Sequence, residues 1–226
     1  MMFGPVQTTP YDLRFSLFGI PVRVLPWFWL MAALLGQSTM DEGLPALGLW
    51  IFAVFISILV HEFGHALSAV AFGYPPQVVL YQFGGMALYS PGREYSLWQS
   101  ILITAAGPLA GLALSAISMG VIVTGLLAEF QIPEGLGYFL NMMFTINLFW
   151  SILNLLPVLP LDGGQICRDV LKLITPRNGL RIALVISVVV GGLVAAAGVA
   201  FKEFYLAILF GVMAISAVQQ LQQRQW

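Results

Sequence analysis

Residues 53–71 read AVFISILVHEFGHALSAVA, and this stretch decides the fold. It lies within a longer apolar run over residues 46–71, which is interrupted only by the ionisable side chains of His61, Glu62 and His65. An α-helix rises ~1.5 Å per residue, so a run of this length can cross a hydrocarbon core of ~30 Å. We therefore predict a membrane-spanning helix that carries three ionisable groups.

The composition of the chain extends this prediction to the whole protein. The 226 residues are 59% hydrophobic and 8% charged, with a mean hydropathy of +0.91. A soluble domain carries about 25% charged residues, so the class of soluble globular proteins is excluded. The net charge of −1 offers no basic surface for nucleic acid. The single cysteine, Cys167, excludes an internal disulfide and a multi-cysteine metal site.

The apolar runs predict an all-α polytopic membrane protein, in one domain, with about six transmembrane helices. They cover residues 17–36, 46–71, 97–127, 136–159, 182–200 and 204–218. The first run is interrupted by Pro21, Arg23 and Pro26, and we expect it to be a retained span rather than a signal peptide. Between the second and third runs, β-branched and aromatic residues around Gly84-Gly85 predict a β-hairpin or short sheet over residues 77–90. An open sheet edge cannot face lipid, so this hairpin must pack on the helices, line a cavity or lie at the cytoplasmic surface.

The basic residues sort to one side of this six-span arrangement. Eight of the nine fall on the side of the chain termini, and only Lys202 falls on the other; the eight are Arg14, Arg23, Arg93, Arg168, Lys172, Arg177, Arg181 and Arg224. The positive-inside rule then places both termini in the cytoplasm. The short, charge-sorted loops suit a prokaryotic inner membrane, and whether the chain forms a homo-oligomer is left open.

The pattern His61-Glu62-Phe63-Gly64-His65 has the spacing of a metal site. Residues four apart share one face of a helix, so the two imidazoles can bind one zinc ion and Glu62 can act on water as a general base. The alternative is a structural pair of core histidines. Ionisable residues in a membrane span are costly and by default functional, and these are the only two histidines in the chain, so we favour the metal site.

A second motif offers a third metal ligand. Catalytic zinc usually takes three protein ligands, and with no third histidine the candidates are Cys167 and a carboxylate. Asp162 lies in residues 154–164, NLLPVLPLDGG, at the end of the fourth predicted span. It could instead, or also, cap the helix predicted over residues 165–174. His61 and Asn154 lie about 22 Å and about 27 Å from the outer ends of their spans, so both motifs reach a similar depth.

The two motifs lie in the second predicted span and at the end of the fourth, in this order along the chain. With both of them, the sequence resembles the site-2 protease family of intramembrane zinc metalloproteases. The Gly84-Gly85 hairpin and the Gly107-Pro108-Leu-Ala-Gly111 segment are also similar to that family. Family members cut transmembrane segments of membrane-protein substrates. The chain is similar to a minimal form, because no stretch between the spans is long enough for a PDZ or CBS domain.

The resemblance implies a role for each motif residue. His61, His65 and Asp162 would bind one Zn²⁺. Glu62 would be the general base and the proton shuttle to the leaving amine, and Asn154 would donate a hydrogen bond to the developing oxyanion. The sheet at Gly84 and Gly85 would bind substrate. Two other classes stay open: a membrane metal-ion transporter or channel, and an inactive relative that only binds substrate helices. Asn147 is expected to hydrogen-bond to a neighbouring helix, and Cys167 to be a packing residue.

Overall fold

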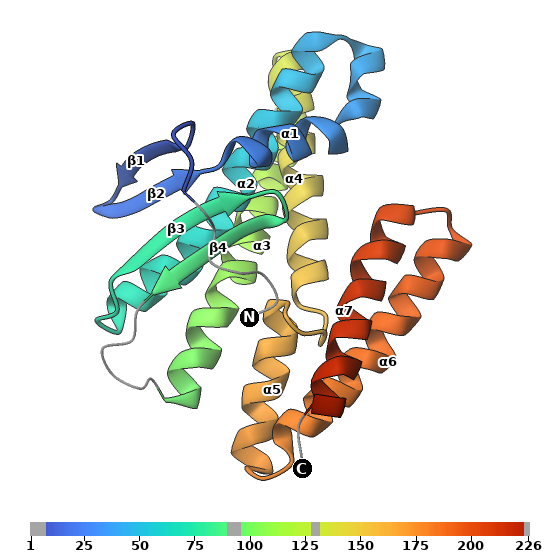
Figure 1. Ribbon diagram of the computed structural model, residues 1–226. Helices are drawn as coiled ribbons and strands as arrows, with labels where there is room; N and C mark the ends of the chain where they lie inside the picture. The colour runs from blue at the N-terminus through green and yellow to red at the C-terminus, as the bar shows by residue number, and fades with distance from the viewer. Residues whose placement is uncertain (1–7, 90–95, 128–131, 224–226) are drawn as a thin grey trace. The chain divides into compact units, whose positions relative to one another are not determined.

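A computed structural model describes residues 8–89, 96–127 and 132–223 (Figure 1). These residues form two compact units. The sheet unit contains residues 8–89, 106–127 and 132–151, and the C-terminal unit contains residues 96–105 and 152–223. Arg93, Arg224 and residue 90 of the predicted hairpin lie outside the described residues.

The first part of the sheet unit contains strands and helices that come before and after the long second helix in the chain. In chain order they are β1 (Leu13–Leu17), β2 (Ile20–Val24), α1 (Pro26–Leu35), the 3-10 helix η1 (Gln37–Glu42), α2 (Leu44–Ala71), β3 (Pro76–Tyr81) and β4 (Gly84–Tyr89). The strands form one sheet in the order β1-β2-β3-β4, which makes β1 and β4 its edges. β2 pairs in parallel with β3, and the other two pairings are antiparallel. The predicted hairpin is therefore half of a larger sheet.

The prediction of a membrane-spanning helix over residues 17–36 is wrong. The first part of this segment is β1 and β2, and α1 has only 10 residues, or about 15 Å of helix. The alternating residues Ile20, Val22 and Val24 are 3%, 2% and 0% exposed, which is the burial pattern of a strand. Pro26 then takes the first helical turn of α1, a position that proline favours.

Five of the described helices are long and apolar enough to cross a membrane, so the count of six is not confirmed. They are α2, α3 (Leu97–Leu127), α4 (Glu134–Asn154), α6 (Gly179–Ala200) and α7 (Phe204–Gln223). The fourth predicted span, 136–159, ends early because Pro157 and Pro160 follow and cannot continue the helical hydrogen bonds. The predicted fold class, an all-α membrane protein with a small sheet, is confirmed.

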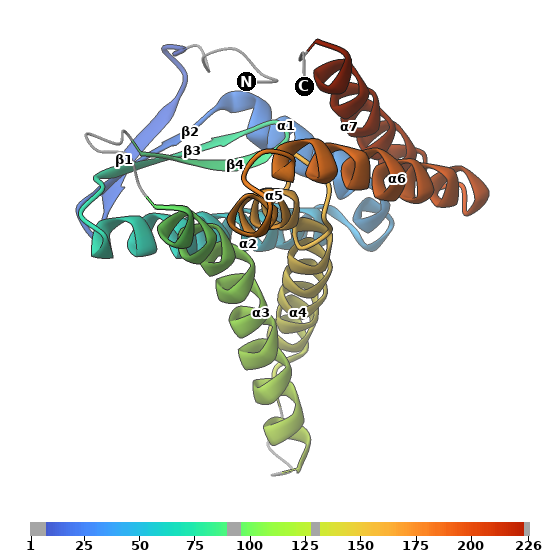
Figure 2. The ribbon, with the colours of Figure 1, turned by 90° about the horizontal axis from the view of Figure 1, so that it is seen from below.

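Within the sheet unit, α2 has different neighbours on opposite sides. The sheet lies on one side, and the parts of α3 and α4 that belong to this unit lie on the other (Figure 2). Buried Val78 and Leu80 of β3 pack with Ile58, Leu59 and other apolar residues of α2. The indole N–H of Trp50 donates a 3.0 Å hydrogen bond to the Ala32 carbonyl and ties α1 to α2. The middle of α2 is therefore enclosed by protein.

The C-terminal unit contains α5 (Asp162–Ile174), α6 and α7, together with the first turns of α3 and the end of α4. α6 and α7 lie side by side (Figure 1). Val158, from the loop before α5, packs with Phe210 and Met213 of α7. This contact fixes the loop of the second motif, which leads into α5.

Candidate metal centre

The two histidines of the first motif face each other on α2. Their Nε2 atoms are 3.2 Å apart, and their rings are inclined by 80°. His61 is 3% exposed and His65 is 8% exposed. The predicted face of the helix therefore brings two imidazole nitrogens to one point inside the protein.

The spacing of these nitrogens fits a metal ion. Two imidazole nitrogens that share one tetrahedral zinc at ~2.0–2.1 Å lie about 3.3 Å apart, close to the 3.2 Å between the Nε2 atoms of His61 and His65. Nitrogen donors of neutral imidazole are also ligands that zinc prefers. The donor set and its spacing are thus those of half a zinc site.

Gly107 of α3 keeps the space beside these nitrogens open. A Cβ atom at residue 107 would lie 2.7 Å from Cδ2 of His65, and closer still to its Cε1 and Nε2. Gly64, between the two histidines, packs as tightly on the backbone of Ala106. The close crossing of α2 and α3 therefore uses glycine on both helices, and on α3 the glycine lies against Nε2 of His65.

Glu62 faces the sheet and is 5% exposed. A Cβ atom at Gly85 of β4 would lie 2.6 Å from both Cδ and Oε1 of Glu62. Burial raises the pKa of the nearby Tyr81 phenol, and the negative charge of Glu62 raises it further. The carboxylate of Glu62 is therefore at the end of the β3–β4 hairpin, next to the two glycines that the sequence singled out.

A hydrogen-bonded pair supports α2 one turn before the histidines. The side-chain amide of Asn147 donates to Ser57 Oγ at 2.8 Å and to the Met143 carbonyl at 2.7 Å. Ser57 lies four residues before His61 and therefore on the same helical face. The expected helix–helix hydrogen bond of Asn147 is confirmed, and it joins α4 to the face of α2 that carries His61.

The residues of the second motif lie in the C-terminal unit. Asn154 is the last residue of α4, and Asp162 is the first residue of α5 and is 9% exposed. Leu161 is the N-cap residue of α5, with no side-chain cap hydrogen bond, so the alternative of Asp162 as the cap is wrong. A Cβ at Gly163 would lie 2.5 Å from the Leu156 carbonyl oxygen. The backbone of Gly163 therefore packs closely on the loop before α5.

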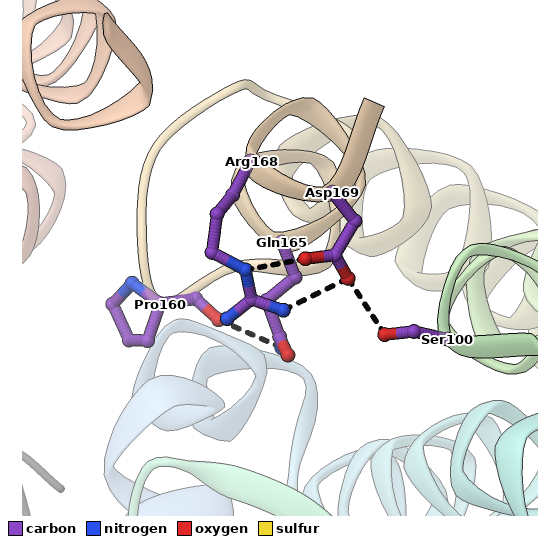
Figure 3. Close-up of polar contacts among 5 residues, drawn as sticks. All are labelled: Ser100, Pro160, Gln165, Arg168 and Asp169. Carbon is purple, nitrogen blue, oxygen red and sulfur yellow. Dashed lines mark hydrogen bonds and ion pairs between the residues drawn. The ribbon is translucent and has the colours of Figure 1, made fainter. Parts of the chain in front are cut away.

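A buried ion pair holds α5 in place (Figure 3). Arg168 donates through Nε and a terminal nitrogen to the two carboxylate oxygens of Asp169, at 2.6 Å and 2.9 Å. Ser100, in the first turn of α3, donates to the same carboxylate at 2.6 Å. Burial alone would raise the pKa of Asp169, but these bonds and the charges of Arg168 and Lys172 lower it. Asp169 is seven residues after Asp162, hence on the same face of α5.

Several of these supporting residues were not identified as such from the sequence. Gly107 lies in the third predicted span, and this position was a usable signal. Membrane sidedness is sufficient to account for Arg168 in the sequence, and no sequence pattern marks its neighbour Asp169 as a buried residue. Cys167 is half-buried, and burial raises the pKa of its thiol, which agrees with a packing residue.

Comparison with known proteins gives matches over most of the chain. Residues 49–136 and 126–197 match Peptidase family M50. The "putative zinc metalloprotease sll0528" of Synechocystis is 32% identical over 74% of this chain and 46% of its own length. The "putative zinc metalloprotease Rip3" of Mycobacterium tuberculosis is 30% identical over 82% of this chain and 52% of its own length. The chain thus spans about half the length of these relatives.

A solved structure shares the fold of almost the whole chain. The site-2 protease from Methanocaldococcus jannaschii aligns with 96% of this chain and 98% of its own, at a TM-score of 0.64 and 24% identity. The family match covers both the His61–His65 motif and the loop that ends at Asp162. The resemblance predicted from the two motifs is confirmed, and the chain belongs to Peptidase family M50.

Proposed function

We propose that this chain is an intramembrane zinc-dependent endopeptidase that hydrolyses peptide bonds in transmembrane segments of membrane-protein substrates. The observation that carries the proposal is the pair of Nε2 atoms 3.2 Å apart on a helix of membrane-spanning length, with Glu62 beside them in the sequence. Membership of Peptidase family M50 supports the same reaction. We place the protein in a prokaryotic cell membrane, as its short loops suggest.

Asp162 would complete the ligand set of a single zinc ion. Two histidines and one carboxylate are three protein ligands, the number that leaves one position for the reaction. Asp162 is a buried carboxylate at the start of α5, and carboxylate oxygen is a donor that zinc accepts beside imidazole nitrogen. Two neutral imidazoles and one carboxylate would leave the zinc centre with a net charge of +1, which favours attack on a carbonyl group.

The chain's own residues then divide the acid–base work. Zinc, when bound, would polarise the scissile carbonyl and lower the pKa of water. The Glu62 carboxylate accepts a proton from the attacking water and returns it to the nitrogen of the leaving amine. The Nδ2 amide of Asn154 donates a hydrogen bond to the oxygen that gains negative charge.

The outer edge of β4 is the proposed substrate-binding edge, at the end marked by Gly84 and Gly85. The Leu80 carbonyl accepts a 2.9 Å hydrogen bond from Leu25 N–H, so the backbone polar groups of Leu80 point away from β4. Its antiparallel partner Gly85 then points its own N–H and C=O outward. A substrate segment that unwinds could add to this edge as a further strand.

We place both termini in the cytoplasm, and the sheet supports this position for the N-terminal strands. The parallel pairing of β2 with β3 places the N-terminal strands at the end of α2 from which β3 leaves. α1 and η1 return the chain to the start of α2, so no further full span is needed. Arg14 and Arg23 of these strands then share a side with the loop after α2, as the positive-inside rule requires.

The proposal is tested with purified protein in liposomes and a single-span substrate tagged at both ends. The wild type should release two fragments. Glu62→Gln should lower the rate by about 10²–10⁴-fold, the usual range for loss of a general base, and should keep its zinc. Glu203→Gln, at an exposed position between α6 and α7, is the matched control and should cleave normally. Equal rates for Glu62→Gln and the wild type would contradict the mechanism.

The third ligand is tested by zinc affinity alone. Asp162→Ala should weaken zinc binding at least ~10-fold, a modest value for loss of a direct ligand when supporting residues alone contribute 10–100-fold. Asp41→Ala removes an exposed carboxylate and should leave the affinity unchanged. An unchanged zinc affinity in Asp162→Ala would refute the assignment of Asp162 as a ligand.

The alternative function, a metal-ion transporter, is not favoured, because family members are named as zinc metalloproteases.

A further inference from the structure

The two adjacent glycines of the β3–β4 hairpin are required for different reasons. Gly84 has a φ of +125°, in the region that favours glycine, and a Cβ there would lie 3.0 Å from the Trp150 ring. Gly85 has no such backbone conformation, since its φ lies outside the positive range. The need for glycine at residue 85 must therefore come from what its backbone touches.

That contact is the side chain of Glu62. A Cβ at residue 85 would lie 2.6 Å from both Cδ and Oε1 of Glu62, and closer still to its Cγ. Ordinary van der Waals contact begins at 3.4 Å. The carboxylate thus lies against the backbone of β4, and any side chain at residue 85 would displace it by about 1 Å.

The sheet register explains why this contact is rigid. Leu80 is the direct partner of Gly85, so the two residues face the same side of the sheet. Leu80 is 0% exposed and packs in the core shared with α2. The strand position beside Glu62 is therefore fixed by buried apolar contacts, and not by the hairpin turn alone.

We propose that Gly85 is a positioning residue for Glu62: its bare backbone holds the carboxylate in the orientation that a general base requires. The inference rests on the proposed function, because it assigns Glu62 the role of base. It gives Gly85 a role in the chemical step in addition to its place on the substrate-binding edge. The raised pKa of Tyr81, to which the Glu62 charge contributes, agrees with a carboxylate at this end of the hairpin.

The test uses Gly85→Ala in the liposome cleavage assay. Misplacement of a catalytic group by about 1 Å costs up to ~10²-fold in rate. We expect kcat to fall by ~10–100-fold, KM to change less than about threefold, and zinc affinity to match the wild type. Gly48→Ala is the matched control, because a Cβ at that position of α2 meets open space. A rise in KM with normal kcat would overturn the proposal, and so would an unchanged enzyme.

A double-mutant cycle separates a contact with Glu62 from a general disturbance of the sheet. Glu62→Ala removes the Cγ, Cδ and Oε1 atoms that a Cβ at residue 85 would strike, so in that background Gly85→Ala should cost no further thermal stability. Additive losses would overturn the proposal. Should Gly85→Ala alone fail to fold, recovery of folding in the double variant would support the contact and failure of both would refute it. Absence of cleavage by the wild type would instead refute the proposed function.

Discussion

Gly107→Ala tests whether the close crossing of α2 and α3 keeps the metal centre open. The added Cβ would lie 2.7 Å from Cδ2 of His65 and closer to Nε2, whereas ordinary contact begins at 3.4 Å. The imidazole must therefore retreat by about 1 Å. Metal–ligand distances tolerate only ~0.2 Å, so His65 would cease to be an effective ligand. We expect the zinc dissociation constant to rise at least ~100-fold, or about 2.8 kcal/mol.

The assay is competition for zinc against a chromophoric chelator, on the detergent-purified protein. Gly111→Ala is the matched control, since it lies one turn further along α3 and its Cβ would crowd Ser151 Oγ instead of a histidine. We expect its zinc affinity to stay within about threefold of the wild type. Gly120→Ala, where a Cβ meets open space, should change neither zinc affinity nor thermal stability.

The reasoning would be refuted by a Gly107→Ala protein that unfolds at the wild-type temperature and binds zinc with wild-type affinity. Replacement of His65 by alanine in the Gly107→Ala background gives a second check, because it removes the ring that the new methyl group would strike. Any thermal stability lost in Gly107→Ala should return in this double variant. A double variant as unstable as the single one would show that the steric contact lies elsewhere.

Three further variants test the supporting structure. The lowered pKa of Asp169 means that its ionised form stabilises the fold above pH ~4, and that this contribution is lost as the pH falls further. Asp169→Asn should thus lower Tm by about 2–8 °C at pH 7 and much less at pH 3. Equal shifts in Tm at the two pH values would count against a stabilising role of the ionised carboxylate. Asn147→Leu should cost about 0.6–1.7 kcal/mol in unfolding free energy, with little further loss on Ser57→Ala; additive losses would argue against the bond. Gly163→Ala should lower Tm by more than ~5 °C, whereas Gly192→Ala, in open space, should not; equal Tm values would contradict the close approach.

The central helix and its motif could be predicted from the sequence because their signals are local. Apolar length and the four-residue spacing of His61 and His65 are properties of one helix, and α2 has both. The same holds for the β3–β4 hairpin, whose strand-forming residues lie around Gly84-Gly85. Such features need no knowledge of what packs against them.

The N-terminal strands could not be predicted from the same local signals. Residues 17–36 are as apolar as a span because β2 is buried in the sheet and α1 is packed on α2. Hydropathy records that the residues avoid water and not which partner covers them. β2 pairs with its chain neighbour β1 and with β3, which lies more than fifty residues later. Pro21, Arg23 and Pro26 were the local signs against a long helix.

The supporting residues of the site were hidden for a related reason. Gly85 and Gly107 are two of 23 glycines, and only the fold brings them against Glu62 and His65. Asp169 is preceded by Arg168, and adjacent opposite charges are common at membrane surfaces. Its burial to 1% exposure, against Ser100, depends on a contact across 69 residues.

The central claim is tested most directly by the masses of the fragments that the reconstituted protein makes from a single-span substrate. The account predicts a cut inside the transmembrane segment that is absent from metal-free protein, restored by one equivalent of zinc, and lost in zinc-loaded Glu62→Gln. A cut outside the segment, or cleavage that persists in that variant, would contradict it.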